Sequence, residues 1–177
     1  MIIWCIFILM CLFVLLLVLA YIKFALLTRR INKNWQALDS LLRYRTQFIS
    51  ALSLYGASLQ EEGPIYLDQL NTAHENLKTA RSVAQRAAEE AQISDAFNKI
   101  LAKLSQQTEL KQDNAFTKLQ ENIQHAETKI QRAQKRYNNS AQEFNMISSI
   151  IPLNLITAMF EMAPFECFEV SDEDKKK

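Results

Sequence analysis

The chain has 177 residues, with 20 basic and 19 acidic side chains, and its net charge of +1 gives no reason to expect a nucleic-acid partner. Its two glycines, three prolines and 49 % hydrophobic content predict an all-α protein. Without the apolar N-terminus about 150 residues remain, which is enough for one domain with a hydrophobic core.

The first element is an apolar segment, residues 1–22, which contains no charged side chain and is long enough to span a bilayer. It lacks a basic region before it and a small-residue cleavage site after it, so a signal anchor is favoured over a cleaved signal peptide. We assign residues 1–27 to this transmembrane anchor. The positive-inside rule predicts a single-pass protein with its N-terminus outside and the rest of the chain in the cytoplasm. The basic residues that follow the apolar run are Lys23, Arg29, Arg30 and Lys33.

The anchor is predicted to continue into the first helix of the soluble part, because no Gly or Pro occurs before Gly56. Apolar residues recur every three or four positions from Ile31 to Leu59, but Arg45 interrupts this pattern. A guanidinium on a buried helix face must be paired or must reach solvent. We therefore expect an ion pair between Arg45 and a carboxylate of a later helix, with a ligand-binding arginine as the alternative. The candidate partners are Glu127 and Glu121.

A second helix is predicted after the Gly-Pro pair at residues 63–64, where Gly suits the end of one helix and Pro the start of the next. It should run from Tyr66 to Ala91, with alanines at contact positions that let a neighbouring helix approach closely. The apolar pattern shifts by one residue after Ala91. Ser94 or Asp95 could therefore cap a separate, shorter helix, or the second helix could kink there.

The longest helix is predicted from Asp113 to Ile151, where apolar residues alternate at spacings of three and four. Asp113 or Asn114 would be its N-cap. Four helices joined by short loops are typical of a bundle, so we assign residues 28–151 to a long antiparallel four-helix bundle. The apolar face of the longest helix comprises Phe116, Leu119, Ile123, Ala126, Ile130, Ala133, Tyr137, Ser140, Phe144, Ile147 and Ile151.

A polar stripe formed by Tyr137, Asn138 and Asn145 flanks this apolar face. Asn138 and Asn145 are seven residues apart and hence lie on one side of the helix, although asparagine is a poor helix former. Two interpretations remain open. The stripe could form hydrogen bonds between helices that fix their register, or it could bind a protein partner or a small ligand.

Residues 152–170 form a short apolar tail, and residues 171–177 a charged, solvated end. The bundle core does not require the tail, and segments this apolar are seldom left in water. We expect the tail either to cap the end of the bundle or to contact a membrane or another chain. The candidate interaction residues of the tail are Leu155, Ile156, Met159, Phe160, Phe165 and Phe168.

Residues suited to catalysis or metal binding are scarce. His74 and His125 each lack a second His or Cys three or four positions away, as a helical metal site would need. Two glycines cannot build a phosphate-binding loop. The acidic neighbours of Cys167 should raise its pKa and make it a poor nucleophile. The sequence therefore predicts no catalytic residue, no metal site, no cofactor and no enzymatic activity.

Two stretches are similar to the LemA family of bacterial membrane proteins. The first is INKNWQALDSLLRYRTQFISAL, which fits the family's pattern at Trp35, Leu38, Asp39, Leu42, Arg43, Arg45, Ile49 and Leu52. It departs from the pattern at Gln47, Ser50 and Ala51. The second combines DNAFTKLQ with AETKIQRAQKRYNNSAQEFNMISSIIPLNLITAMF and ends in FECFEV. The family's Gly-Leu-Phe-Gly-Phe turn corresponds to residues 158–162, which contain no Gly.

This resemblance implies a membrane span with a short outside N-terminus, a cytoplasmic helical bundle and no known enzymatic activity. Two functions of different class are compatible with it. The first is a non-enzymatic module at the bacterial inner membrane that acts through protein–protein interaction or self-assembly, so that a protein partner or a homo-oligomer is expected. The second is a membrane-associated sensor or signalling adaptor that transmits a change in helix register along the unbroken first helix.

Overall fold

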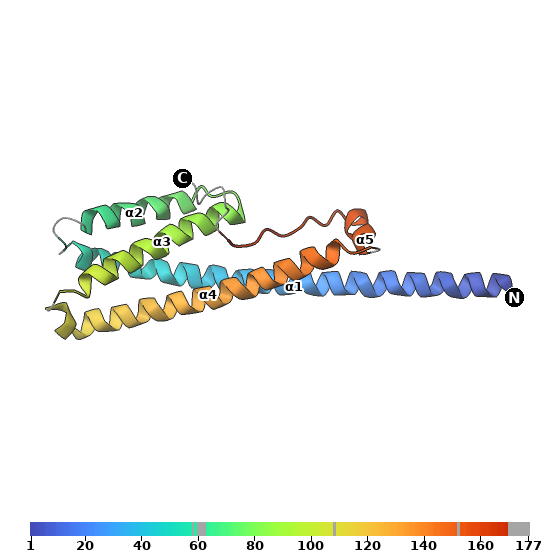
Figure 1. Ribbon diagram of the computed structural model, residues 1–177, viewed down its shortest axis with the longest axis horizontal. Coiled ribbons are helices and arrows are strands. Elements are labelled where there is room, and N and C mark those ends of the chain that lie inside the picture. Colours follow the sequence, from blue (N-terminus) through green and yellow to red (C-terminus); the bar gives the residue numbers. More distant parts are fainter. Residues whose placement is uncertain (58, 60–62, 108, 152, 170–177) are drawn as a thin grey trace.

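The computed structural model describes residues 1–57, 59, 63–107, 109–151 and 153–169, and Figure 1 shows them as an elongated assembly of helices. The predicted all-α class is confirmed, since this part of the chain contains helices and no strand. The predicted charged end, residues 171–177, lies outside the described residues. The helices are α1 (Ile2–Gly56), α2 (Gly63–Leu77), α3 (Val83–Leu104), the short 3-10 helix η1 (Leu110–Gln112), α4 (Asn114–Ser148) and α5 (Leu153–Met159).

Helix α1 is one unbroken helix of 55 residues, which corresponds to about 80 Å at the usual rise per residue. The predicted continuation of the apolar N-terminal segment into the bundle is therefore confirmed. Its N-terminal part projects beyond the other helices, and residues 1–16 are exposed (Figure 1). Helix α1 contains a stretch that is long and apolar enough to cross a membrane. Burial begins at Ala20 and Phe24, so the bundle starts where the charge-free run ends.

Helix α4 runs antiparallel to α1. Residue numbers rise along α1 while those of the contacting residues fall along α4, as three aromatic pairs show. The pairs, with their ring-centroid distances, are Phe24 with Phe144 at 5.4 Å, Trp35 with Tyr137 at 5.2 Å and Tyr55 with Phe116 at 5.3 Å.

The hairpin of α2 and α3 lies along the half of α1 that is farther from the N-terminus (Figure 1). In this distal half the four long helices enclose one hydrophobic cluster, which includes Leu52, Leu70, Phe97, Ile100 and Ile123. A second cluster, in the half nearer the N-terminus, joins α1 and α4 to the tail and includes Phe24, Ile31, Leu38, Phe144 and Phe168. In this proximal half the tail therefore packs against α1, α4 and the N-terminal end of α3, where Ala87 also belongs to the cluster.

The predicted apolar face of α4 is buried from Phe116 to Ile147, except that Leu119 is partly exposed. The helix begins as predicted. Asp113 is its N-cap, and the side-chain carboxylate accepts a hydrogen bond from the N–H of Ala115 at 2.7 Å. This bond satisfies a main-chain donor that has no partner within the helix.

The prediction for Ile151 is wrong, because this side chain is 80 % exposed and lies beyond the end of α4 at Ser148. The hydroxyls of Ser148 and Ser149 donate to the carbonyls of Asn145 and Met146, each at 2.8 Å. Such local side-chain bonds offer the main chain an alternative to further helix. The apolar spacing continues past this point, but the helix does not.

The break between α2 and α3 lies at residues 78–82, so the break predicted after Ala91 was wrong. Ser82 is the N-cap of α3, and its hydroxyl accepts a hydrogen bond from the N–H of Gln85 at 3.0 Å. The side chain of Gln85 in turn accepts from the N–H of Arg81 at 2.9 Å, which resembles a capping box. Ser94, one of the expected caps, lies inside α3.

Replacing Ser82 with alanine should lower the free energy of unfolding by about 1 kcal/mol, because the first turn of α3 loses the acceptor of the Gln85 N–H. Chemical denaturation of the full chain in detergent micelles, followed by circular dichroism, measures the change. Asp95→Ala is the matched control, since Asp95 lies within α3. Equal losses in the two variants would contradict the assignment of Ser82 as the cap.

Helix α5 ends in a Schellman-type turn that contains no glycine. The N–H of Met162 donates to the carbonyl of Thr157 at 2.8 Å, and the N–H of Glu161 donates to that of Ala158 at 3.4 Å. Glu161 has a φ of 49°, in the left-handed region where glycine is usual. Residues 158–162 therefore form a turn without glycine, and this turn sends the chain back along the bundle.

Candidate functional site

Residues 162–169, which we call the strap, run back from α5 across α4 and α1 without regular secondary structure (Figure 1). Two phenylalanines attach it to the helices. The Phe165 ring contacts the Phe144 ring at 4.9 Å between centroids, and the Phe168 ring contacts Trp35 at 6.0 Å. Phe168 is only 3 % exposed, so the strap closes the core of the proximal half.

Each of the two asparagines of the polar stripe pairs with the main chain of one of these phenylalanines. The Asn138 Nδ2 donates to the Phe168 carbonyl at 3.2 Å, and its Oδ1 accepts from the Phe168 N–H at 2.7 Å. Asn145 forms the same two bonds with Phe165, at 2.8 and 2.9 Å. Each side-chain amide thus satisfies both polar main-chain groups of a residue that lies outside any helix.

The spacing of the two segments explains this match. Seven residues of helix, the separation of Asn138 and Asn145, rise by about 10.5 Å. Three residues of extended chain, the separation of Phe165 and Phe168, rise by about 10 Å. The strap runs antiparallel to α4, because the later phenylalanine pairs with the earlier asparagine.

Further hydrogen bonds fix the strap between three helices. The Tyr137 hydroxyl donates to the Glu166 carbonyl, and Gln134 Nε2 donates to the Phe168 carbonyl, each at 2.8 Å. The Glu166 carboxylate accepts from the N–H of Val83 at 3.0 Å, at the N-terminal end of α3. A carboxylate is stabilising there, because the first N–H groups of a helix lack partners and carry partial positive charge.

The three side chains of the predicted polar stripe, Tyr137, Asn138 and Asn145, therefore all form hydrogen bonds with one segment of the chain, the strap. The interpretation as hydrogen bonds between helices is wrong, since the partners of the three side chains lie in the strap. Asn138 is 7 % exposed, and it is one of the residues that line a surface pocket of about 280 Å³ beside the strap. The paired spacings of the asparagines and of the phenylalanines could have revealed this contact in the sequence.

The predicted tail residues divide into two groups. Ile156, Phe165 and Phe168 pack against the cluster of the proximal half. The others, Leu155, Met159 and Phe160, are exposed. The predicted folding back of the tail is confirmed for the first group, while the exposed group lies around α5.

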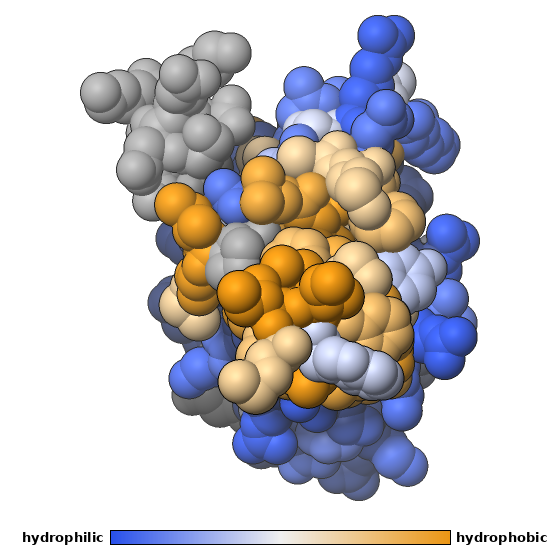
Figure 2. Space-filling model, turned by 90° about the vertical axis from the view of Figure 1, so that its right-hand side faces the viewer, coloured by the Kyte–Doolittle hydropathy of each residue, from blue (hydrophilic) through white to orange (hydrophobic). Residues whose placement is uncertain are grey.

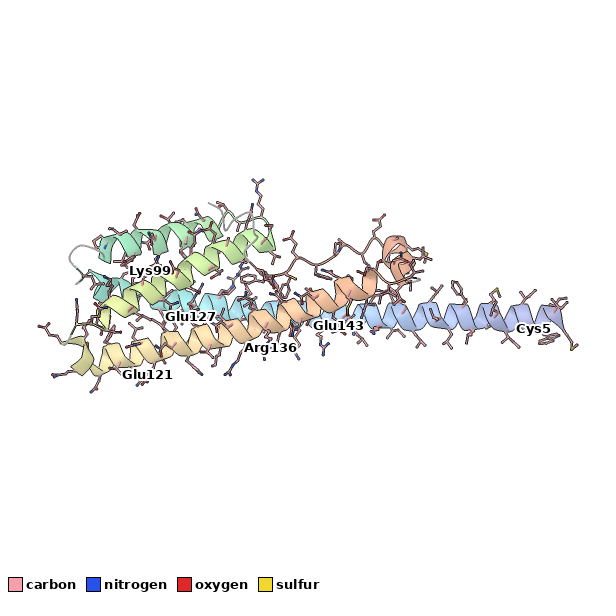
Figure 3. The ribbon with its side chains drawn as sticks, in the orientation of Figure 1. Cys5, Lys99, Glu121, Glu127, Arg136 and Glu143 are labelled. Carbon is pink, nitrogen blue, oxygen red and sulfur yellow. The ribbon has the colours of Figure 1, made fainter. Side chains whose placement is uncertain are left out.

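The second polar feature is a buried ion cluster around Arg45, whose side chain is 1 % exposed. Its guanidinium donates to Glu127 Oε1 at 2.9 Å and also contacts the carboxylate of Glu90 and the hydroxyl of Ser94. The structure thus brings Arg45 and Glu127 together, as the sequence suggested. Glu121, the other candidate partner, is exposed and lies on a different side of α4 from Glu127 (Figure 3).

Sequence reasoning did not identify Glu90 or Ser94 as members of this cluster. Both lie on α3, and the apparent shift in its apolar pattern reflects them, because they face the guanidinium instead of a hydrophobic core. A cavity of about 80 Å³ adjoins the cluster, and Gln134 and Phe168 are among its lining residues. The strap and the ion cluster therefore line the same cavity.

The sequence profile of the LemA family matches residues 34–177, which is most of the chain. The chain belongs to the LemA family. The matched range begins after the anchor and includes the ion cluster, the polar stripe and the strap. None of the curated proteins compared with this LemA-family chain matches it.

Burial raises the pKa of the Glu90 carboxyl in this LemA-family chain above its ordinary range, because desolvation outweighs the attraction of Arg45, and the charge of Glu127 adds to the rise. Between about pH 4.3, the ordinary value, and the raised value, the folded state binds more protons than the unfolded state. The contribution of Glu90 to folding stability should therefore decrease as the pH rises through this window.

Glu90→Gln removes this titration, so the melting temperature of the variant minus that of the parent should increase with pH through the same window. Thermal melts followed by circular dichroism at a series of pH values measure the difference. Glu121→Gln is the control, since Glu121 is exposed. A difference for Glu90→Gln that stays constant or falls with pH would contradict the raised pKa.

The cysteine and the two histidines considered for chemistry lie outside the polar stripe and the ion cluster described above. The predicted rise in the pKa of Cys167 is confirmed, with burial as the first cause and the charge of Glu169 as the second. Such a thiol is a poor nucleophile. Within the described ranges, no group of three His, Cys, Asp or Glu side chains is placed to hold a metal ion. Of the histidines, His125 is exposed and His74 is partly buried.

Proposed function

We propose that this LemA-family chain is a non-enzymatic, membrane-anchored helical bundle that acts through protein–protein interaction or self-assembly at the cytoplasmic face of the bacterial inner membrane. The observation that carries the proposal is α1, which is at once the exposed apolar anchor and a core helix of the bundle. A bundle attached in this way is held close to the membrane in a defined orientation, which suits a docking module.

The use of the polar side chains supports a non-enzymatic role. Arg45 is enclosed by carboxylates, and Asn138 and Asn145 are bonded to the strap. These are the residues whose types and positions made them candidates for binding or chemistry. Their partners within the chain give them a structural role instead.

A groove between α3 and α4 that is lined by several polar side chains is our candidate contact surface for a partner. It has a volume of about 450 Å³, and most of its lining side chains carry amide or hydroxyl groups that can both donate and accept hydrogen bonds. These groups suit a polar helix or loop of another protein or of a second copy. The amide and hydroxyl residues are Asn98, Ser105, Gln120, Gln124, Thr128 and Gln131.

Site-specific photocrosslinking in intact membranes tests the proposal. A photoreactive amino acid at Gln124, in the groove, should give a discrete adduct, whereas the same residue at exposed Lys129, which is not among the groove residues, should not. An adduct of twice the chain mass of 20.5 kDa would indicate self-assembly, and another mass a different protein. Absence of any discrete adduct from Gln124 would contradict an interaction through this groove.

The proposed orientation predicts that a reporter fused after Lys177 is active only in the cytoplasm, because the basic residues Lys23, Arg29, Arg30 and Lys33 follow the apolar run. Two reporters distinguish the two sides of the membrane. One fluoresces only in the cytoplasm, and the other is enzymatically active only outside. A short run of lysines inserted after Met1 should weaken or invert the orientation. Protease cleavage of the bundle from outside intact cells would contradict the proposal.

The alternative function is a membrane-associated sensor or signalling adaptor. Its supporting observation is that α1 carries the buried ion cluster on the same unbroken helix as the anchor, so a shift of the anchor would displace Arg45. Spin labels at exposed Arg29 and Asn139 would report the register of α1 against α4. A second distance population in thicker bilayers would favour the sensor, and one unchanged population would exclude this mechanism.

A further inference from the structure

Exposed apolar side chains beyond the charge-free run of residues 1–22 are concentrated around α5. Among the described residues beyond Ile22, ten large hydrophobic side chains are exposed, and six of them lie within residues 146–160. Leu155 is 63 % exposed and Met159 is 71 % exposed. Both belong to α5, which has seven residues. The six residues are Met146, Ile150, Ile151, Leu155, Met159 and Phe160.

Capping of the bundle does not explain these side chains. The inward face of the segment already closes the core through Ile156, which is 3 % exposed, and the strap closes it through Phe168. Leu155, Met159 and Phe160 are exposed and do not belong to that core cluster. A surface of this composition requires an occupant other than water.

The position of α5 along α1 indicates what covers its exposed apolar side chains. Helix α5 packs beside the last turns of the charge-free run, where the Phe160 ring contacts the Tyr21 ring at 5.1 Å between centroids. A shallow apolar groove of about 280 Å³ separates the two helices, and its lining residues are Leu17, Val18, Tyr21, Ile156, Met159 and Phe160. Leu17 lies five residues before Ile22, which is about 7.5 Å along the helix axis.

The positions of the charged residues around α5 agree with its place beside the end of the charge-free run. Residues 144–160 contain no charged side chain and are bounded by Glu143 and Glu161. Glu143 pairs with Arg30 of α1 at 3.1 Å, well past the end of the apolar run. Viewed from the N-terminal end of the molecule, the near surface is hydrophobic, and hydrophilic residues lie around and behind it (Figure 2).

We propose that these six exposed residues around α5 form a second membrane contact, with α5 lying in the boundary between acyl chains and headgroups of the leaflet in which the span of α1 ends. Helix α5 is far too short to cross a bilayer, but an interfacial helix needs to bury its apolar face by only about 5–10 Å. The exposed apolar surfaces of α1 and α5 are continuous at their shared groove. Lipid that surrounds residues 2–17 would therefore also meet Met159 and Phe160.

This proposal rests on the membrane anchoring put forward above. It assigns the tail's exposed residues to lipid instead of to a second copy or another protein. It also gives the bundle two attachment points, α1 and α5, which together restrict its tilt and its rotation about the axis of α1. A groove between α3 and α4 would then face a fixed direction relative to the membrane.

Quenching by brominated lipids tests the depth of α5 in the full chain. In a variant with Cys5, Cys11 and Cys167 replaced by alanine, single cysteines M159C and L155C carry an environment-sensitive fluorophore. The protein is reconstituted in phosphatidylethanolamine–phosphatidylglycerol bilayers with bromine on the upper acyl carbons. L16C is the reference within the span, and N139C, on exposed α4 surface, is the reference in water.

The proposal predicts that M159C and L155C lose most of their fluorescence, as L16C does, while N139C keeps its own. Labels at M159C and L155C that behave like N139C, with L16C quenched, would overturn the second contact and leave the anchor intact. Cross-linking of M159C between two copies, without lipid quenching, would also overturn it and assign the surface to self-association. An unquenched L16C would overturn the anchoring itself.

Discussion

Arg45→Ala should lower the free energy of unfolding by about 3–5 kcal/mol, because it removes one partner of a buried ion pair and leaves the other uncompensated. That other is Glu90, whose side chain is 6 % exposed and whose carboxylate faces the guanidinium. Glu127, at 2.9 Å, loses the same partner but is 15 % exposed, so water can replace part of the interaction. Chemical denaturation of the full chain in micelles, followed by circular dichroism, measures the loss.

Two further variants separate charge from packing at this site. Arg45→Leu should destabilise less than Arg45→Ala, because leucine refills part of the space. The double variant Arg45→Leu with Glu90→Leu should recover stability further, since replacing both members of a buried pair by apolar residues is often neutral or stabilising. Arg43→Ala is the control, because Arg43 is 79 % exposed and pairs with Asp39 at the surface. Negligible effects of both Arg45 variants would contradict a structural role of the ion cluster.

Phe168→Ala should cost about 3–5 kcal/mol, because it removes a fully buried aromatic side chain from the cluster that joins the strap to α1 and α4. The strap should then detach, since its remaining ring contact, Phe165 with Phe144, lies nearer α5. Hydrogen exchange of residues 162–169, measured by mass spectrometry in micelles, should become faster than in the parent, and the melting temperature should fall.

The hydrogen bonds of the strap give a second route to the same state. Asn138→Ala leaves the buried N–H and carbonyl of Phe168 without these partners, at a cost of about 1–3 kcal/mol. Phe160→Ala is the control, because Phe160 is 48 % exposed and lies outside the strap. If Phe168→Ala and Phe160→Ala had equal effects on exchange and melting, the strap would not be the element that closes the proximal half.

The helices themselves could be predicted from local patterns. The alternating spacing of three and four in α4 and the absence of Gly and Pro before Gly56 in α1 report on single helices, and a helix depends mainly on residues within two turns of one another. The pairing of Arg45 with Glu127 was also accessible, because a cation on an apolar helix face demands a carboxylate. The helix break was predicted at the wrong place, since the cap formed by Ser82 and Gln85 outweighed the apolar phase near Ala91.

What the sequence by itself determined is therefore an all-α chain with an apolar N-terminal segment that continues into a helical bundle, together with its membership of the LemA family. Only the tertiary structure decided which groups the polar side chains form hydrogen bonds with. Asn138 and Asn145 bond to main-chain atoms some 20 to 30 positions away, and main-chain atoms are the same in every residue, so no side-chain pattern names them. The inward and outward faces of the tail were likewise decided by the surfaces of α1 and α4 on which it lies.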